Sequence, residues 1–158
     1  MVCGDRLIDR QDERGGWKVR GQATRPLTGF SHGAAGMVAA LAQLHHVTGE
    51  KRFLESAKRA LNYERGLFDE QVGNWPDFRN SEKPDYFMNS WCHGAPGIAL
   101  SRLCLKGTAL WDSAGEEELI WALETTSKIS INSDKNYYDT NISDHHHFFN
   151  ESTNELID

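Results

Sequence analysis

Four segments of the chain place apolar residues at helical spacing. In residues 34–47 and 95–106, apolar side chains occupy almost the whole circumference, which predicts two largely buried helices. In residues 51–65 and 115–127, they form a stripe opposite charged residues, which predicts two half-exposed helices. Runs with the alternation of a β-strand are missing, which argues against a parallel α/β fold. The pattern therefore predicts an all-α fold, with inner and outer helices alternating around a partial α/α toroid or barrel.

Within each pair, the first helix is expected to be the more buried one. The stripes of the half-exposed helices are expected to consist of Phe53, Ala57, Ala60 and Leu61 in the second segment, and of Leu119, Ala122 and Leu123 in the fourth. Ser113 and Glu116 have the spacing of a capping box, so the last helix is expected to begin near them.

An internal repeat connects the two pairs of helices. The segment SHGAAG at positions 31–36 returns as CHGAPG at positions 92–97, and 92 − 31 gives a period of 61 residues. A loop with glycine and tryptophan precedes each copy, GGW at 15–17 and GNWP at 73–76. A period of this length, carrying a pair of helices, is typical of repeat architectures.

The character of the chain changes after residue 126. Asn, Asp and Ser dominate residues 127–158, and helical periodicity ends there. So few apolar groups provide little to offset the entropy of ordering. We therefore predict one domain over residues 1–126, followed by a polar, poorly ordered tail over 127–158.

Composition narrows the classes of partner. The chain has 158 residues, a formal net charge of −6 and 17 Lys and Arg residues that form no run, which argues against a nucleic-acid partner and favours a peptide or small molecule. No stretch approaches the roughly 20 apolar residues of a membrane span, and the N-terminus lacks the apolar core of a signal peptide. Three widely spaced cysteines suit a reducing compartment. Cytoplasmic residence is expected.

Cys92 and His32 are the strongest candidates for chemistry. Cys92 lies in a glycine-rich turn at a predicted helix N-terminus, where backbone N–H groups favour the thiolate that zinc binds. His32 occupies the equivalent place in the first repeat, so a ring of helices would direct both turns toward one mouth. His93 is a weaker candidate because its neighbour is the better metal ligand. Each residue also has an ordinary structural interpretation, as a buried thiol or a satisfied histidine.

Other polar groups are less promising. His145, His146 and His147 resemble a metal-binding tract, but they lie in the polar tail, where nothing fixes them toward one ion. The carboxylates of the loop between the repeats are expected to be solvated rather than an acid/base pair; they include Asp69, Glu70, Asp77 and Asp85. Cys104 is expected to be an ordinary core residue.

The two repeat copies, with their flanks, resemble a known family. TGFSHGAAG at 28–36 and NSWCHGAPGI at 89–98 are similar to two signature segments of lanthionine synthetase C-like (LanC-like) proteins, and most closely to the C-terminal cyclase domain of class II lanthipeptide synthetases. The resemblance extends from about Arg6 to Thr126. It implies an α/α toroid with a central zinc site and a lanthipeptide precursor peptide as the partner.

The resemblance also implies roles for individual residues. Cys92 corresponds to a zinc ligand, His32 to the acid/base residue, and His93 to a residue that lines the site. The reaction implied is the addition of peptide cysteine thiols to dehydroalanine or dehydrobutyrine, which forms the thioether rings of lantibiotics. Zinc would deprotonate the bound thiol near neutral pH, and a histidine would transfer the proton.

Two departures from the family pattern matter. The family completes its zinc site with a later Cys-His-Gly segment, but no cysteine follows Cys104. Stand-alone cyclases often have an arginine four residues before the zinc cysteine, where this chain has Met88. We also expect the upstream helices and any dehydratase domain of the family to be absent from this chain. We therefore expect a fragment whose zinc site is incomplete, and which by itself is inactive.

Two other functions remain open at this stage. One is an α/α-barrel enzyme that processes carbohydrate with the acids of the loop between the repeats. The other is a non-catalytic relic that keeps a peptide-binding face after the loss of the metal.

Overall fold

The computed structural model describes residues 2–18, 25–79 and 86–126, together with the backbone of four short strands at 128–132, 135–138, 148–150 and 155–157. Contacts divide the chain into two units, Met1–Thr125 and Thr126–Asp158. The assignment of residues 1–126 and 127–158 as a cyclase domain and a tail stays a prediction. None of the described helices is long and apolar enough to cross a membrane.

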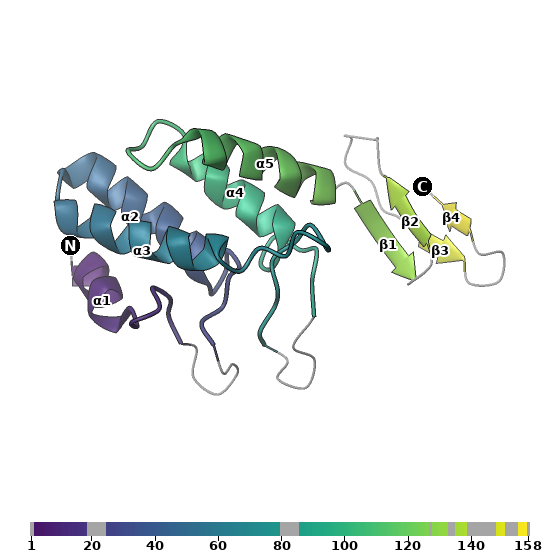
Figure 1. Cartoon of the computed structure of the whole chain (residues 1–158), viewed down its shortest axis with the longest axis horizontal. Helices are drawn as coiled ribbons and strands as arrows, with labels where there is room; N and C mark the ends of the chain where they lie inside the picture. The colour runs from purple at the N-terminus through teal and green to yellow at the C-terminus, as the bar shows by residue number, and fades with distance from the viewer. Residues whose placement is uncertain are drawn as a thin grey trace. The chain divides into compact units, whose positions relative to one another are not determined.

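Five helices make up the described part of the first unit (Figure 1). The four predicted helices are confirmed to within a few residues, and a short N-terminal helix precedes them. In chain order they are α1 (Val2–Arg10), α2 (Ala34–Thr48), α3 (Lys51–Arg65), α4 (Ala95–Leu105) and α5 (Ser113–Thr126). The prediction of an all-α architecture of paired helices is therefore confirmed.

The sequence repeat is also a structural repeat. Helices α2 and α4 lie side by side, and the turns that lead into them meet at one end of the unit (Figure 1). The side-chain amide of Gln43 on α2 donates to the backbone oxygen of Cys104 on α4 at 2.7 Å, and these positions are 61 residues apart. Ser101 donates to the carbonyl of Ala35 at 2.8 Å. The two helices are therefore bonded at two points, and at Gln43 and Cys104 equivalent positions of the repeat face each other.

The core consists of two apolar clusters. The larger one joins α2 and α3, and the predicted stripe of α3 is confirmed because all four residues are buried. The smaller one joins α4, α5 and Trp75 of the loop between the repeats, together with Ala35 of α2. Leu119 and Ala122 are buried in this cluster as predicted, whereas Leu123 is about half exposed.

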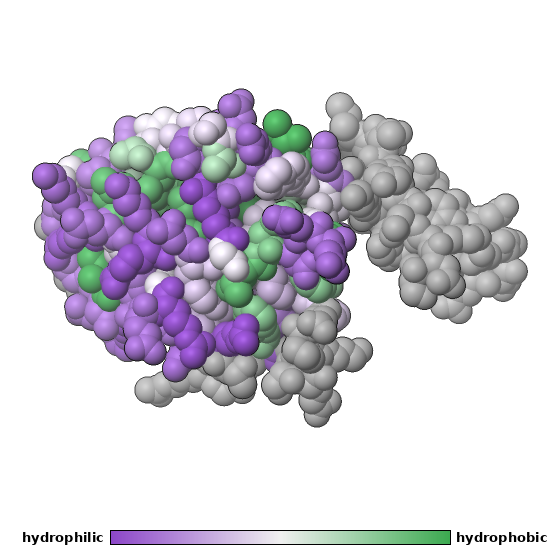
Figure 2. All heavy atoms as spheres, in the orientation of Figure 1, coloured by the Kyte–Doolittle hydropathy of each residue, from purple (hydrophilic) through white to green (hydrophobic). Residues whose placement is uncertain are grey.

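The predicted difference in burial holds for only one of the two pairs. Helix α4 is more buried than α5, but α2 and α3 have six buried residues each. Val47, in the last turn of α2, is 80% exposed, and Leu100 and Leu103 of α4 are also exposed. These side chains lie outside both core clusters, so neither α2 nor α4 is covered by other parts of the chain on every side. Figure 2 shows apolar side chains, in green, among polar ones on the visible surface of the first unit.

The start of α5 differs from the predicted capping box. The helix begins at Ser113, but the side chain of Asp112 accepts the backbone N–H of Gly115 at 2.7 Å. Asp112 therefore satisfies one of the free amides of the first turn, which is the role expected of an N-cap carboxylate.

Four short strands follow α5, and the sequence pattern did not predict them. Strand β1 (Lys128–Asn132) pairs antiparallel with β2 (Lys135–Tyr138), and β3 (Phe148–Asn150) pairs antiparallel with β4 (Glu155–Ile157). Ile129 and Ile131 alternate with polar residues, and β2 and β3 contain adjacent aromatic residues, both of which favour extended backbone. The surrounding polar composition obscured this short signal.

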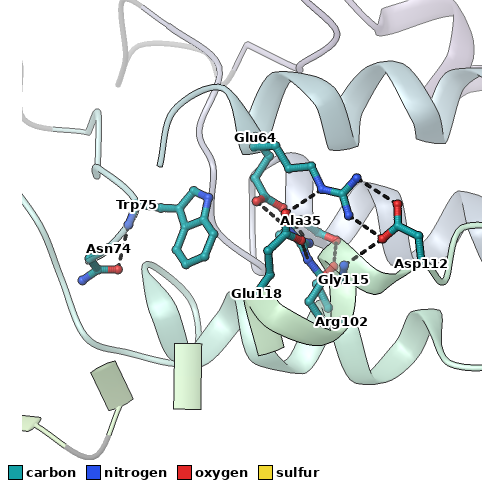
Figure 3. Close-up of polar contacts among 10 residues, drawn as sticks. Ala35, Glu64, Asn74, Trp75, Arg102, Asp112, Gly115 and Glu118 are labelled. Atoms are coloured by element: carbon teal, nitrogen blue, oxygen red, sulfur yellow. Dashed lines mark hydrogen bonds and ion pairs between the residues drawn. The ribbon is translucent and has the colours of Figure 1, made fainter. Parts of the chain in front are cut away.

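A buried ion cluster connects three helices of the first unit (Figure 3). Arg102 of α4 is fully buried, and its two terminal nitrogens donate to the two carboxylate oxygens of Glu64 on α3 at 2.8 and 2.7 Å. Its Nε donates to Glu118 on α5 at 2.6 Å. Glu118 also pairs with Arg65 at 2.7 Å, and Arg65 pairs with Asp112. One guanidinium therefore holds α3 and α5 against α4.

Burial and pairing act in opposite directions on this cluster. Burial raises the pKa of Glu64 in spite of the attraction of Arg102. Burial would lower the pKa of Arg102, but Glu64 and Glu118 outweigh it, and the pKa of Arg102 lies above its ordinary value. The raised pKa of Glu64 favours a neutral carboxyl group, whereas the raised pKa of Arg102 favours a charged pair with Glu64. We favour the charged pair because two guanidinium N–H groups donate to Glu64 in parallel.

We expect Arg102→Met to destabilise the protein by about 3–5 kcal/mol, because it leaves the buried carboxylate of Glu64 without its paired guanidinium and takes one of two guanidinium partners from Glu118. Chemical denaturation followed by circular dichroism measures the change. Lys58→Met, at an exposed position of α3, is the matched control and should change stability by less than about 0.5 kcal/mol. Adding Glu64→Gln to Arg102→Met should recover part of the loss. Equal midpoints for the Arg102 and Lys58 variants would show that the cluster does not hold the helices together.

Candidate functional site

The two glycine turns are in direct contact. The backbone N–H of Ser31, before α2, donates to the carbonyl of Cys92, before α4, at 3.3 Å. Gly29 lies so close to the second turn that a Cβ at its position would be 2.3 Å from the oxygen of Cys92. Only glycine permits this approach without a shift of backbone. The sequence repeat thus places His32 and Cys92 on neighbouring turns.

The turn that carries Cys92 is closed by its own backbone. Ser90 and His93 exchange two N–H···O bonds, of 3.0 and 3.1 Å. Gly94 follows with a φ of 81°, in the left-handed region that side chains rarely adopt, and a Cβ there would be 1.7 Å from the carbonyl oxygen of Met88. Glycine at this position is therefore required by both conformation and space.

The loop between the repeats also fixes this turn. The side-chain oxygen of Asn74, in the GNWP segment, accepts the N–H of Ala95 at 2.9 Å and that of Trp75 at 2.8 Å. Its amide nitrogen donates to the side chain of Asn89 at 2.9 Å. Asn74 thus satisfies an amide at the start of α4 from a distant part of the chain, in the manner of a cap. Thr28 donates to the carbonyl of Pro76 at 2.9 Å, which ties the first turn to the same loop.

The three predicted site residues differ in their surroundings. His32 is exposed, Cys92 is partly buried with its sulfur 3.2 Å from the hydroxyl oxygen of Ser90, and His93 is buried. Burial lowers the pKa of His93, and the charges of Arg79 and His32 act in the same direction, against that of Asp77. The neutral imidazole of His93 is therefore favoured. The chemical roles of the three residues stay predictions.

Asp77 is not the solvated loop residue that the sequence predicted. It is 3% exposed, and Arg79 donates to both of its carboxylate oxygens, from Nε at 3.0 Å to each and from Nη2 at 2.6 Å. Burial alone would raise the pKa of Asp77, but the hydrogen bonds from Arg79 outweigh it and the pKa lies below its ordinary value. The sequence signal for this ion pair was an arginine two positions after Asp77, directly after the Trp75-Pro76 segment.

The other candidates of the sequence analysis fall outside the site. Asp69 is used by its own loop, since its carboxylate accepts the N–H groups of Gln71 and Val72 at 2.9 and 3.0 Å. Glu70 is exposed. Asp85 lies outside the described residues, as do the three tail histidines at 145–147.

The prediction that Cys104 is an ordinary core residue is wrong. It is only partly buried, in the same class as Cys92. The helical pattern identified an apolar helix, but it could not show which side of α4 the other helices cover. Exposure alone therefore gives no reason to expect preferential labelling of the Cys92 thiol.

The described residues do not fit a complete catalytic zinc site. Such a site usually takes three protein ligands. Within the described part of the chain, no group of three His, Cys, Asp or Glu residues is arranged to hold a metal ion. Asp77, the buried carboxylate near His93, is already paired with Arg79.

Comparison with known proteins identifies the architecture. The family model described as lanthionine synthetase C-like protein matches residues 1–138. No curated protein and no solved structure matches the chain. Proteins of this family have an α/α toroid fold and act on peptides, so the paired helices belong to that architecture.

We expect Gly94→Ala to destabilise the protein more than Gly107→Ala. Gly107 also has a positive φ, of 79°, but nothing lies within 4 Å of a Cβ there, so alanine should cost only the left-handed strain of about 1–2 kcal/mol. Gly94→Ala adds a collision with the Met88 carbonyl, and the total should exceed about 3 kcal/mol. Thermal unfolding of the two variants gives the difference. Equal losses would mean that the close approach at Gly94 does not constrain the turn.

Proposed function

The chain belongs to the lanthionine synthetase C-like family, and we propose that it is part of a cyclase that adds cysteine thiols of a lanthipeptide precursor to dehydroalanine or dehydrobutyrine. The observation that carries the proposal is the contact between the two glycine turns, Ser31 N–H to Cys92 carbonyl, which gathers His32, Cys92 and His93. The similarity of both turns to class II cyclase domains supports this assignment, and a cytoplasmic location suits it.

The reaction is balanced without an oxidant or a reductant. The S–H bond of the peptide cysteine and the π bond between the α- and β-carbons of the dehydro residue break, a C–S bond forms at the β-carbon, and a proton is delivered to the α-carbon. His32 is exposed and can exchange this proton with substrate as general acid and base. His93 lies on the turn of Cys92, and burial lowers its pKa, which favours the neutral imidazole, the form that can accept a proton.

Zinc would lower the pKa of the substrate thiol when bound, and we assign Cys92 as one of its ligands. Cys92 is a suitable donor because its sulfur lies in a turn of fixed backbone. The described residues leave the ligand set incomplete, and further ligands would have to come from outside them. We therefore propose that this chain by itself binds zinc weakly and closes no rings.

A non-catalytic peptide-binding module is the second candidate. The shortage of metal ligands among the described residues favours it, since the paired turns could still bind a peptide. A carbohydrate-processing enzyme has less support, because Asp69 is bonded to its own loop and Asp77 is paired with Arg79.

Zinc retention and ring closure test the proposal. After gentle dialysis, the unmodified chain should keep well under one zinc per molecule and should not cyclise a dehydrated precursor peptide. Replacing residues 127–158 with a family Cys-His-Gly segment and its surrounding helices should restore both properties. In that chimera, Cys92→Ala should weaken zinc binding by at least about tenfold, and Cys104→Ala is the matched control.

Two outcomes would contradict the proposal. A chimera that binds zinc tightly but closes no ring would leave the peptide-binding module as the function. An unmodified chain that retains one tight zinc, loses it on Cys92→Ala and closes a ring would show that its site is complete.

A further inference from the structure

We propose that Arg79, held in place by the buried Asp77, is a binding residue for an anionic oxygen beside Cys92. The group it would bind is a carboxylate, or the enolate oxygen that thiol addition creates on a dehydro residue. The enolate part rests on the proposed function. Anion recognition beside Cys92 does not, and it can be tested separately.

The guanidinium of Arg79 is fixed from two sides. On one side, Nε and Nη2 donate to the carboxylate of Asp77, which is almost fully buried and itself anchored by the bond of its N–H to the carbonyl of Tyr86 at 2.8 Å. On the other side, Nη2 lies 3.4 Å from the sulfur of Met88. Two anchors of this kind restrict the rotamers of a long side chain and pre-organise its charge.

The second anchor places Arg79 at the Cys92 turn. Met88 is packed against that turn, since its carbonyl oxygen occupies the space beside the α-carbon of Gly94 and accepts a hydrogen bond from Asn74 at 3.4 Å. The hydrogen bond to Asp77 is the chief reason why the pKa of Arg79 is raised. Through its contact with Met88, the guanidinium is therefore placed next to the turn that carries Cys92.

The geometry leaves Arg79 able to receive a ligand. Its side chain is 35% exposed, whereas that of Asp77 is 1% exposed. The negative member of the pair thus points into the protein, and the positive member is accessible to solvent. A pre-organised cation at the position where negative charge develops is the arrangement that stabilises an oxyanion.

Anion recognition can be measured without zinc or cyclisation. Iodoacetate and iodoacetamide both alkylate a thiolate, so the ratio of their rates at one cysteine cancels any change in the fraction of thiolate. It reports the preference for an anionic reagent over a neutral one. Mass spectrometry of proteolytic peptides, after the reaction is quenched, follows Cys92 separately from Cys3 and Cys104.

We expect Arg79→Gln to lower the iodoacetate-to-iodoacetamide ratio at Cys92 by about two- to fivefold, the effect of one charge at short range in a solvated setting. Arg79→Lys should retain most of the ratio. Arg52→Gln is the matched control, because Arg52 is also an accessible arginine paired with carboxylates, on α3, and it should leave the Cys92 ratio unchanged. The ratios at Cys3 and Cys104 should not change in any variant.

A double variant tests whether a lower ratio in Arg79→Gln arises from misfolding. Arg79→Gln leaves Asp77 buried without its partner, whereas Asp77→Asn combined with Arg79→Gln removes both charges. The ratio at Cys92 should fall in the double variant as well. An unchanged ratio in both variants overturns the inference and leaves the cyclase proposal intact.

The catalytic part is measured in the zinc-binding chimera. There, Arg79→Gln should lower kcat for ring closure by at least about tenfold with little change in KM, since an enolate exists only during the reaction. A loss confined to KM would show that Arg79 binds the ground-state peptide and would overturn the enolate assignment. A chimera that closes no ring would refute the proposed function, while a lowered reagent ratio would still support anion recognition.

Discussion

The contact between the two glycine turns is the constraint on which the candidate site depends. Gly29 lies against the carbonyl of Cys92, and Gly94 lies against that of Met88, at separations that no Cβ could tolerate. These approaches allow Ser31 to bond to Cys92 across the repeat. Without them, His32 and Cys92 would be carried by turns that stand apart. The glycines of the repeated segment thus allow the two turns to approach each other, and the candidate chemistry belongs to the residues that lie between these glycines.

The helices keep these turns together by a different kind of interaction. The backbone of α2 and α4 is joined by Gln43 and Ser101, and Arg102 binds carboxylates from both outer helices. A buried guanidinium is costly to desolvate, so it contributes only when it is well paired; here each of its three nitrogens donates to a carboxylate oxygen of Glu64 or Glu118. Removing one carboxylate would leave a buried charge partly unpaired. The cluster therefore favours one arrangement of the helices over alternatives that apolar packing alone would also permit.

Much of the fold could be predicted from the sequence because its signals are local. Helical spacing located α2 to α5, and the 61-residue repeat located the two turns that meet. Contacts between distant segments could not be predicted in this way. The burial of Asp77, the cap that Asn74 provides to α4 and the exposure of Cys104 each depend on which surfaces meet after folding. The strands after α5 gave only a short alternating signal, at Ile129 and Ile131, within a polar segment.

The central claim is that His32 and Cys92 face a common site, and cross-linking tests it most directly. In a chain with Cys3→Ser and Cys104→Ser, His32→Cys supplies a second thiol on the first turn, while His46→Cys places one near the far end of α2, which is 15 residues long. At about 1.5 Å per residue, that position is nearly 20 Å from the turn. A short bifunctional thiol reagent should join Cys92 to the new thiol at position 32 rapidly and within one molecule, and should not join it to the thiol at position 46. Equal cross-linking of the two variants, or none at position 32, would contradict the claim.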